Sequence, residues 1–178
     1  MNWIWIAIRV TGLTGYFLLT LSLLVGIYSH IPRKKSFVLI FHQIIGQVAL
    51  LFIGIHAYLL IFDHYEPYSI KSILLPFSAP NEPILNGMGT IATYLLIIVV
   101  VTSDFMKQIG RSIWKKTHYL VFPLWLLSAI HGLFLGSDSQ TVWGDILYAS
   151  TTVTVILSTL FLILKRSKTE QRRVRSVS

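Results

Sequence analysis

The sequence predicts an all-α integral membrane protein, a helical bundle of about five transmembrane helices with its N-terminus outside and its C-terminus inside the cell. Of its 178 residues, 54% are hydrophobic and 12% are charged, about half the charged share of ordinary soluble domains. Five apolar runs are each roughly long enough to cross a hydrocarbon core about 30 Å thick. They cover approximately residues 3–28, 37–62, 87–103, 117–136 and 143–164.

Polar or proline-rich segments separate these runs. Residues 29–36 contain the basic run 33–35, residues 104–116 are basic again, and prolines interrupt residues 63–86. Little chain is left for an extramembrane domain, so we expect one membrane domain over residues 1–178. The N-terminus has neither the basic start nor the small-residue cleavage site of a secretory signal, and we expect the first helix to be retained.

Basic residues are concentrated on one side of the predicted bundle. If successive helices alternate across the membrane, the 29–36 loop, the 104–116 loop and the tail after Leu164 share one side. These segments hold every lysine and arginine except Arg9 and Lys71. By the positive-inside rule that side is the cytoplasm. The formal charge of +8 then reflects membrane orientation, and nucleic acid is not expected as a partner.

The tail, residues 165–178, is predicted to be a basic cytoplasmic segment attracted to anionic lipid headgroups. The alternative is a docking surface for an acidic cytoplasmic partner. We expect a multi-pass protein of the plasma membrane, and the short chain favours a bacterial one. The sequence has no cysteine, which excludes disulfides, iron–sulfur ligation by thiolates and the attachment motif of c-type haem.

Four of the six histidines fall inside apolar runs, where an ionisable side chain is costly and indicates a functional site. They are His42 and His56 in the second run and His118 and His131 in the fourth, whereas His30 and His64 lie in loops. The second and fourth helices are predicted to run parallel, and each pair climbs about 20 Å along its helix. The sequence therefore predicts two pairs at matched depth, His42 with His118 near the inner face and His56 with His131 near the outer face.

Two such pairs suit two b-type haems, each held between a histidine from either helix. The fourteen-residue spacing of His42 and His56 returns to within about 40° of one helix face, as shared ligation requires. The thirteen-residue spacing of His118 and His131 leaves about 140°, and we expect Pro123 to kink the helix and change its phase. A zinc centre is disfavoured because the two levels are too far apart to share one ion.

Small and aromatic residues near the histidines are further candidates for contact with the haems. Gly46 and Gly54 would let a flat macrocycle approach the backbone of the second helix, although helix packing explains these glycines equally well. Trp125, with Phe52 and Phe122, lies between the two histidine levels. The alternative for all three aromatic residues is an ordinary place in the core or against lipid.

Basic residues near the helix ends are candidates for pairing with haem propionates. Arg9 is the only basic residue inside an apolar run, and we expect it to form charge-assisted hydrogen bonds with the outer haem. The alternative for Arg9 is snorkelling to the interface. The candidates for the inner propionates are Lys115, Lys116, Arg111 and Arg33.

Several motifs resemble those of a known family. Thr102-Ser103 ends one run, a short basic loop follows, and Trp114-Lys115-Lys116-Thr117-His118 opens the fourth. The second run, from His42-Gln43-Ile44-Ile45-Gly46 to His56, and the opening Arg9-Val10-Thr11-Gly12 extend the likeness over nearly the whole chain. This pattern resembles the ferric reductase-like transmembrane domain, in its two-haem branch. Larger members of that family have an additional helix and a cytosolic FAD and NAD(P)H domain, whereas this chain stops at Ser178.

The resemblance implies a haem oxidoreductase that carries electrons across the membrane one at a time. The expected donor is a cytoplasmic flavin reductase, a free reduced flavin or a quinol, and the expected outer acceptor is ferric iron, oxygen, a flavin or a redox protein. Outer acidic residues, namely Asp63, Glu66, Glu82 and Asp138, are candidates for attracting ferric complexes. Two rival functions stay open: a quinone-linked cytochrome b anchor subunit, and a proton or metal-ion transporter with a histidine relay.

Overall fold

The computed structural model describes residues 3–29 and 35–175, and every regular element among them is helical. His30 and Arg33 lie outside the described residues. The elements in chain order are α1 (Trp3–Tyr28), α2 (Lys35–Leu59), the 3-10 turn η1 (Leu60–Phe62), α3 (Ile70–Leu74), α4 (Pro83–Asp104), α5 (Met106–Ile109), α6 (Arg111–His118), α7 (Val121–Leu135), the 3-10 turn η2 (Ser137–Gln140) and α8 (Val142–Arg175).

Five helical segments of the described chain are long and apolar enough to span a membrane, which confirms the predicted fold class. They cover Trp3–Tyr28, Phe37–Phe62, Pro83–Asp104, Arg111–Leu135 and Val142–Lys165. The third begins four residues before the predicted 87, because a proline is well accommodated in the first turn of a helix. The fifth continues without a break into the basic tail as far as Arg175.

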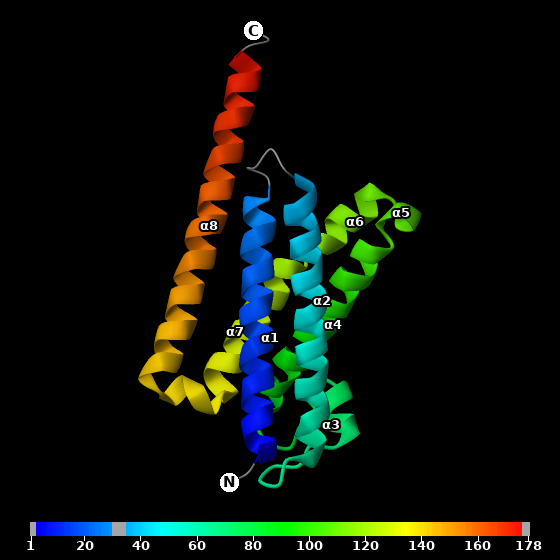
Figure 1. Cartoon of the computed structure of the whole chain (residues 1–178), viewed down its shortest axis with the longest axis vertical. Helices are drawn as coiled ribbons and strands as arrows, with labels where there is room; N and C mark the ends of the chain where they lie inside the picture. The colour runs from blue at the N-terminus through cyan, green and yellow to red at the C-terminus, as the bar shows by residue number, and fades with distance from the viewer. Residues whose placement is uncertain (1–2, 30–34, 176–178) are drawn as a thin grey trace.

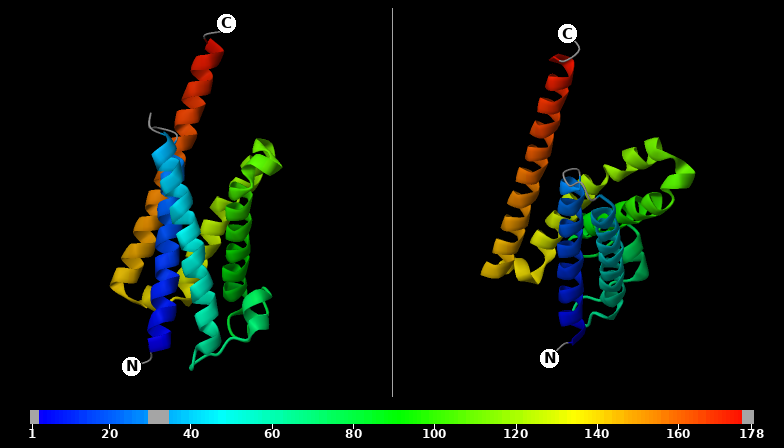
Figure 2. Two further views of the ribbon diagram at one scale, coloured as in Figure 1. Left: turned by 45° about the vertical axis from the view of Figure 1, so that its right-hand side comes forward. Right: turned by 45° about the horizontal axis from the view of Figure 1, so that its top comes forward.

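The bundle is arranged around α1, which packs along α2 on one side and also contacts α7 and α8. The α4 helix packs mainly along α7 and meets α2 less closely. Figures 1 and 2 show α8 flanking α1 and extending beyond the other helices, with the two termini at opposite ends of the bundle. The basic α5–α6 corner and the C-terminal end of α8 lie toward the same end (Figure 1).

The fourth span is broken between its two histidines. The α6 helix ends at His118, and α7 begins at Val121 after a short turn. Pro123 has no backbone N–H and its ring conflicts with the carbonyl of Tyr119, four residues earlier, so a regular helix cannot continue through this point. The sequence predicted a kink at the proline, and the structure places the interruption one turn before it.

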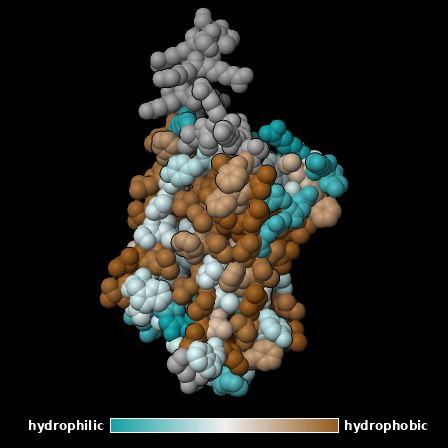
Figure 3. Space-filling view, in the orientation of Figure 1, coloured by the Kyte–Doolittle hydropathy of each residue, from teal (hydrophilic) through white to brown (hydrophobic). Residues whose placement is uncertain are grey.

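A compact set of buried side chains joins the helices at mid-height. Leu19 and Leu23 of α1, Ala49 of α2, Leu124 of α7 and Leu96 of α4 are all at most 3% exposed. Large hydrophobic side chains also cover much of the outer surface, between polar groups at either end (Figure 3). An apolar surface of this kind is stable in lipid and not in water.

Candidate functional site

The structure brings the four intramembrane histidines together in two places. The imidazoles of His42 on α2 and His118 at the end of α6 lie side by side, with ring centroids 5.9 Å apart and ring planes 75° apart. His56, farther along α2, and His131 of α7 form the second group, in which the two imidazoles are close enough for an electrostatic interaction. Each place therefore combines one histidine from α2 with one from the fourth span.

Three of these imidazoles are held by the same contact with a neighbouring helix. The Nδ1 atom of His42 lies 2.8 Å from the carbonyl oxygen of Ser22, and that of His56 lies 2.9 Å from the carbonyl of Ile8. His131 has its Nδ1 atom 2.9 Å from the carbonyl of Leu85 on α4. A carbonyl only accepts hydrogen bonds, so Nδ1 donates its proton in each case.

His118 is held by a side chain instead of a carbonyl. Its Nδ1 atom lies 3.4 Å from the hydroxyl of Ser103, which donates its own proton to the carbonyl of Val99 at 2.7 Å. The indole N–H of Trp114 donates to the same hydroxyl at 3.2 Å. Ser103 and Trp114 belong to the motifs that accompany His118 in the sequence, and this contact gives them a common structural role.

All four histidines thus have Nδ1 engaged with a neighbouring group. A neutral imidazole that donates from Nδ1 keeps an unprotonated Nε2, which is the atom available to a metal. Hydrogen bonds to the other ring nitrogen are also what orients a metal-binding histidine. The arrangement presents two pairs of oriented imidazoles on the apolar spans, each with an unprotonated Nε2 atom that can bind a metal.

Glycines make room for the held imidazoles, and sequence analysis missed them. An added Cβ would lie 2.9 Å from His56 at Gly12, 3.1 Å from His42 at Gly26, and 2.7 Å from His131 at Gly89. Each glycine stands four residues after the carbonyl that accepts the bond: Ile8 and Gly12, Ser22 and Gly26, Leu85 and Gly89. The sequence did contain a signal for this contact. Each of these three histidines has a glycine at about the same depth in a neighbouring apolar segment.

The two glycines proposed from sequence have different surroundings. An added Cβ at Gly46 would lie 3.5 Å from the hydroxyl of Ser22, so this glycine faces α1 and serves helix packing. At Gly54 an added Cβ would meet nothing within 4 Å. Neither glycine is close to an imidazole, and the close approach of a haem to their backbone stays a prediction.

Arg9 forms an ion pair with Asp138. Its guanidinium donates from Nε at 2.9 Å to one carboxylate oxygen of Asp138 and from the adjacent amino group to the other, and it lies over the ring of Trp5. The side chain of Asp138 is only 4% exposed, whereas that of Arg9 is 29% exposed. The expectation that Asp138 attracts ferric complexes from solution is wrong, because this carboxylate is buried and paired with Arg9.

The remaining candidates occupy the core and the polar end. Trp125 is buried, stacks on Tyr16 with ring centroids 6.4 Å apart, and donates its indole N–H to the hydroxyl of Thr20 at 2.9 Å. Lys115 and Lys116 are exposed in the turn of α6 that precedes His118. Within residues 3–29 and 35–175, no three histidine or carboxylate side chains converge into a site for a bare metal ion.

The geometry of the inner pair suits a bis-histidine iron. Two imidazoles bound to opposite faces of one metal at about 2 Å each have ring centres about 6 Å apart. His42 and His118 have ring centroids 5.9 Å apart with Nε2 unengaged by the contacts described above. A haem supplies its own four nitrogen ligands and needs only two from the protein, so these residues fit the group.

Comparison with known families decides the relationship. The family model described as "Ferric reductase like transmembrane component" matches residues 11–129, more than half of the chain. The chain belongs to the ferric reductase-like transmembrane family. The matched segment contains His42, His56 and His118, while Arg9 and His131 lie outside it. No curated protein and no solved structure matches the chain.

Membership in the ferric reductase-like family gives the coarse function. This is a multi-pass membrane protein of a family associated with transmembrane electron transfer and oxidoreductase-type activity. The match is to the transmembrane component, in agreement with the resemblance seen in the sequence.

Proposed function

We propose that this ferric reductase-like protein carries electrons across the membrane through two b-type haems. His42 and His118 hold one haem, and His56 and His131 hold the other. The observation that carries the proposal is that all four imidazoles are hydrogen-bonded through the same ring nitrogen. Each has its Nδ1 atom engaged with a neighbouring helix and its Nε2 atom available, and they occur as two pairs.

When bound, haem iron supplies reversible one-electron chemistry. The chain's own contribution is to orient the ligands and exclude water. The carbonyls of Ser22, Ile8 and Leu85 fix the tautomer and direction of three imidazoles, and the hydroxyl of Ser103 does so for His118. Buried aromatic and aliphatic side chains, including Trp125, fill the space at mid-height and keep it dry.

The basic end of the bundle is proposed to face the cytoplasm. The described cationic residues of α5, α6 and the end of α8 lie toward the end opposite the N-terminus (Figure 1). His42 and His118 then form the inner site, next to Lys115 and Lys116, and His56 and His131 form the outer site. This orientation suits a cytoplasmic-side donor, either a flavin reductase or a quinol, in a bacterial plasma membrane.

The acceptor is proposed to lie outside the cell, with ferric iron, oxygen, a flavin or a redox protein as the candidate classes. Arg9 is also proposed to contact the outer propionates. Its ion pair with Asp138 leaves one amino group of the guanidinium outside that pair, which supports a second role.

Haem content measured by the pyridine haemochrome assay, with reduced-minus-oxidised spectra, tests the proposal on detergent-purified protein. We expect about two haems b per chain, the loss of one in both His42→Ala and His118→Ala, and the loss of the other in His56→Ala and His131→Ala. His64→Ala is the matched control, because His64 is an exposed loop residue. A colourless wild-type protein would reject electron transfer and favour the histidine-relay transporter.

A further inference from the structure

A carboxylate and two amides meet on the seam between α2 and α4. Gln43 donates its side-chain N–H to Asp104 at 2.8 Å, and Gln47, one turn farther along α2, donates to both oxygens of Asp104 at 3.3 and 3.4 Å. All three side chains are exposed on the surface of the bundle. Asp104 is the last residue of α4, so the cluster lies where the third span meets the basic 104–116 loop.

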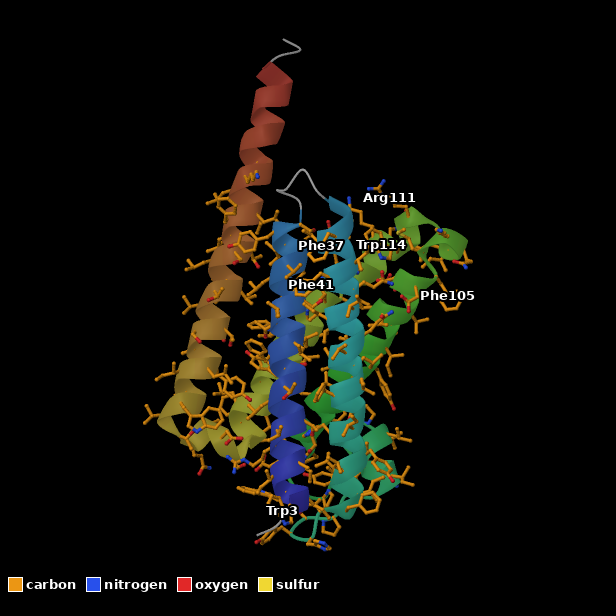
Figure 4. The ribbon with its side chains drawn as sticks, in the orientation of Figure 1. Trp3, Phe37, Phe41, Phe105, Arg111 and Trp114 are labelled. Atoms are coloured by element: carbon orange, nitrogen blue, oxygen red, sulfur yellow. The ribbon has the colours of Figure 1, made fainter. Side chains whose placement is uncertain are left out.

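The surface around these polar groups is apolar. Phe41 and Ile44 on α2 are 44% and 51% exposed, and Val101 and Phe105 beside Asp104 are 46% and 53% exposed. Figure 4 shows Phe41 and Phe105 at the end of the bundle opposite Trp3, the end that also carries Trp114. Hydrogen-bonding groups set in a lipid-facing apolar surface suit a ligand that arrives through the bilayer and has a polar ring with an apolar body.

The same cluster lies at the level of the inner pair along α2 and α4. Gln43 follows His42 in α2, and Asp104 follows Ser103, whose hydroxyl accepts the hydrogen bond from His118. The cluster therefore stands where a reductant would come closest to the inner site. The glutamines supply N–H donors, and the carboxylate supplies an acceptor for a hydroxyl proton.

We propose that the Gln43–Gln47–Asp104 cluster is the docking site of a quinol, which is the electron donor to the inner site. This inference rests on the proposed function. Oxidation of the quinol to the quinone breaks two O–H bonds and releases two electrons and two protons. The electrons leave singly to ferric haem at the inner pair, and the carboxylate of Asp104 accepts each proton in turn and passes it to cytoplasmic water.

Binding and reduction are measured on haem-loaded protein. Isothermal titration with an oxidised short-chain benzoquinone gives the Kd, and anaerobic mixing with the corresponding quinol gives the rate of haem reduction in proteoliposomes. A hydrogen bond to a charged group predicts that Asp104→Asn raises the Kd and lowers the reduction rate by about tenfold or more. Asp104→Glu is expected to recover much of both. Reduction by dithionite and the haem content remain unchanged.

Asp145→Asn is the matched control, because it removes an exposed carboxylate from the start of α8 at the other end of the bundle. If Asp104→Asn does not accumulate, Gln47→Leu keeps the carboxylate and carries the same expectation of weaker quinone binding. Equal Kd and equal reduction rate in wild type and Asp104→Asn would overturn the proposal. So would a wild type that is loaded with haem and reduced by dithionite or reduced flavin but neither binds nor oxidises quinol. Haem-loaded protein that ignores quinol would contradict only the docking site and would still agree with the proposed electron transfer. Absence of haem would contradict the proposed electron transfer itself.

Discussion

A methyl group on Gly89 of α4 would lie 2.7 Å from the imidazole of His131 on α7. Real Cβ atoms do not approach other atoms so closely, so the bare backbone of Gly89 is required for the observed position of His131. The contact stands next to the hydrogen bond from His131 to Leu85, one helical turn earlier. The same relationship joins Gly12 to His56 and, less tightly, Gly26 to His42.

Substitution of these glycines by alanine is predicted to reduce haem content in a graded order. Gly89→Ala and Gly12→Ala place Cβ at 2.7 and 2.9 Å from an imidazole and are expected to displace it, which removes most of the outer haem. Gly26→Ala, at 3.1 Å, requires a shift of a few tenths of an ångström and is expected to weaken inner haem binding only partly. The pyridine haemochrome assay measures the result.

Gly54→Ala is the control for this series. An added Cβ there meets nothing within 4 Å, and alanine favours a helix over glycine by up to about 1 kcal/mol. The imidazoles are therefore expected to keep their positions, and the haem content to stay well above that of Gly89→Ala and Gly12→Ala. Equal haem content in Gly89→Ala would contradict the assigned role of the glycine.

Ser103→Ala is predicted to weaken the inner site specifically. The substitution removes the acceptor of both the His118 imidazole and the Trp114 indole. Loss of a group that orients a metal ligand typically lowers affinity by about tenfold to a hundredfold. The rate of haem transfer to apomyoglobin measures the change and is expected to be faster than in the wild type. The spectrum of the inner haem identifies which site loses its haem. Ser103→Thr keeps the hydroxyl and is expected to stay close to the wild type.

Breaking the ion pair between Arg9 and Asp138 is predicted to destabilise the protein. Asp138→Ala leaves the guanidinium without its carboxylate partner, and because Arg9 is partly exposed we expect a loss of about 1–3 kcal/mol. Thermal unfolding in detergent, followed by circular dichroism, measures this effect. Replacement of both residues, Arg9→Leu with Asp138→Leu, is expected to recover part of the loss. A double variant whose loss equals or exceeds the sum of the losses in Arg9→Leu and Asp138→Leu would refute the pairing.

Pro123→Ala is predicted to prevent His118 and His131 of the fourth span from pairing with the histidines of α2 at the same time. Alanine restores a backbone N–H and removes the ring that conflicts with the carbonyl of Tyr119, so α6 and α7 can join into a regular helix. At about 100° per residue, His118 and His131 would then face about 140° apart. Haem content is expected to fall from about two toward one per chain. Pro80→Ala, an exposed residue of the α3–α4 connection, serves as the control.

Much of the fold was predictable because it depends on local composition. The long apolar runs predicted all five spans, and the prolines and basic residues between them predicted where the spans separate. Boundaries were less accurate at Pro83, where α4 begins with a proline, and at Arg111, where a polar first turn extends the span beyond its apolar part. The continuation of α8 to Arg175 was also missed, since a basic helix carries no apolar signal.

The sequence alone determined which residues carry the candidate chemistry, because an ionisable histidine in an apolar run stands out by its cost. The tertiary structure decided which neighbouring groups orient these histidines. A backbone carbonyl such as that of Ile8 has no signature in the sequence, and Gly12 acquires its role only when α2 brings His56 against it. The pairing of Arg9 with Asp138 likewise joins residues 129 positions apart, so only packing of α1 against the α7–α8 turn could reveal it.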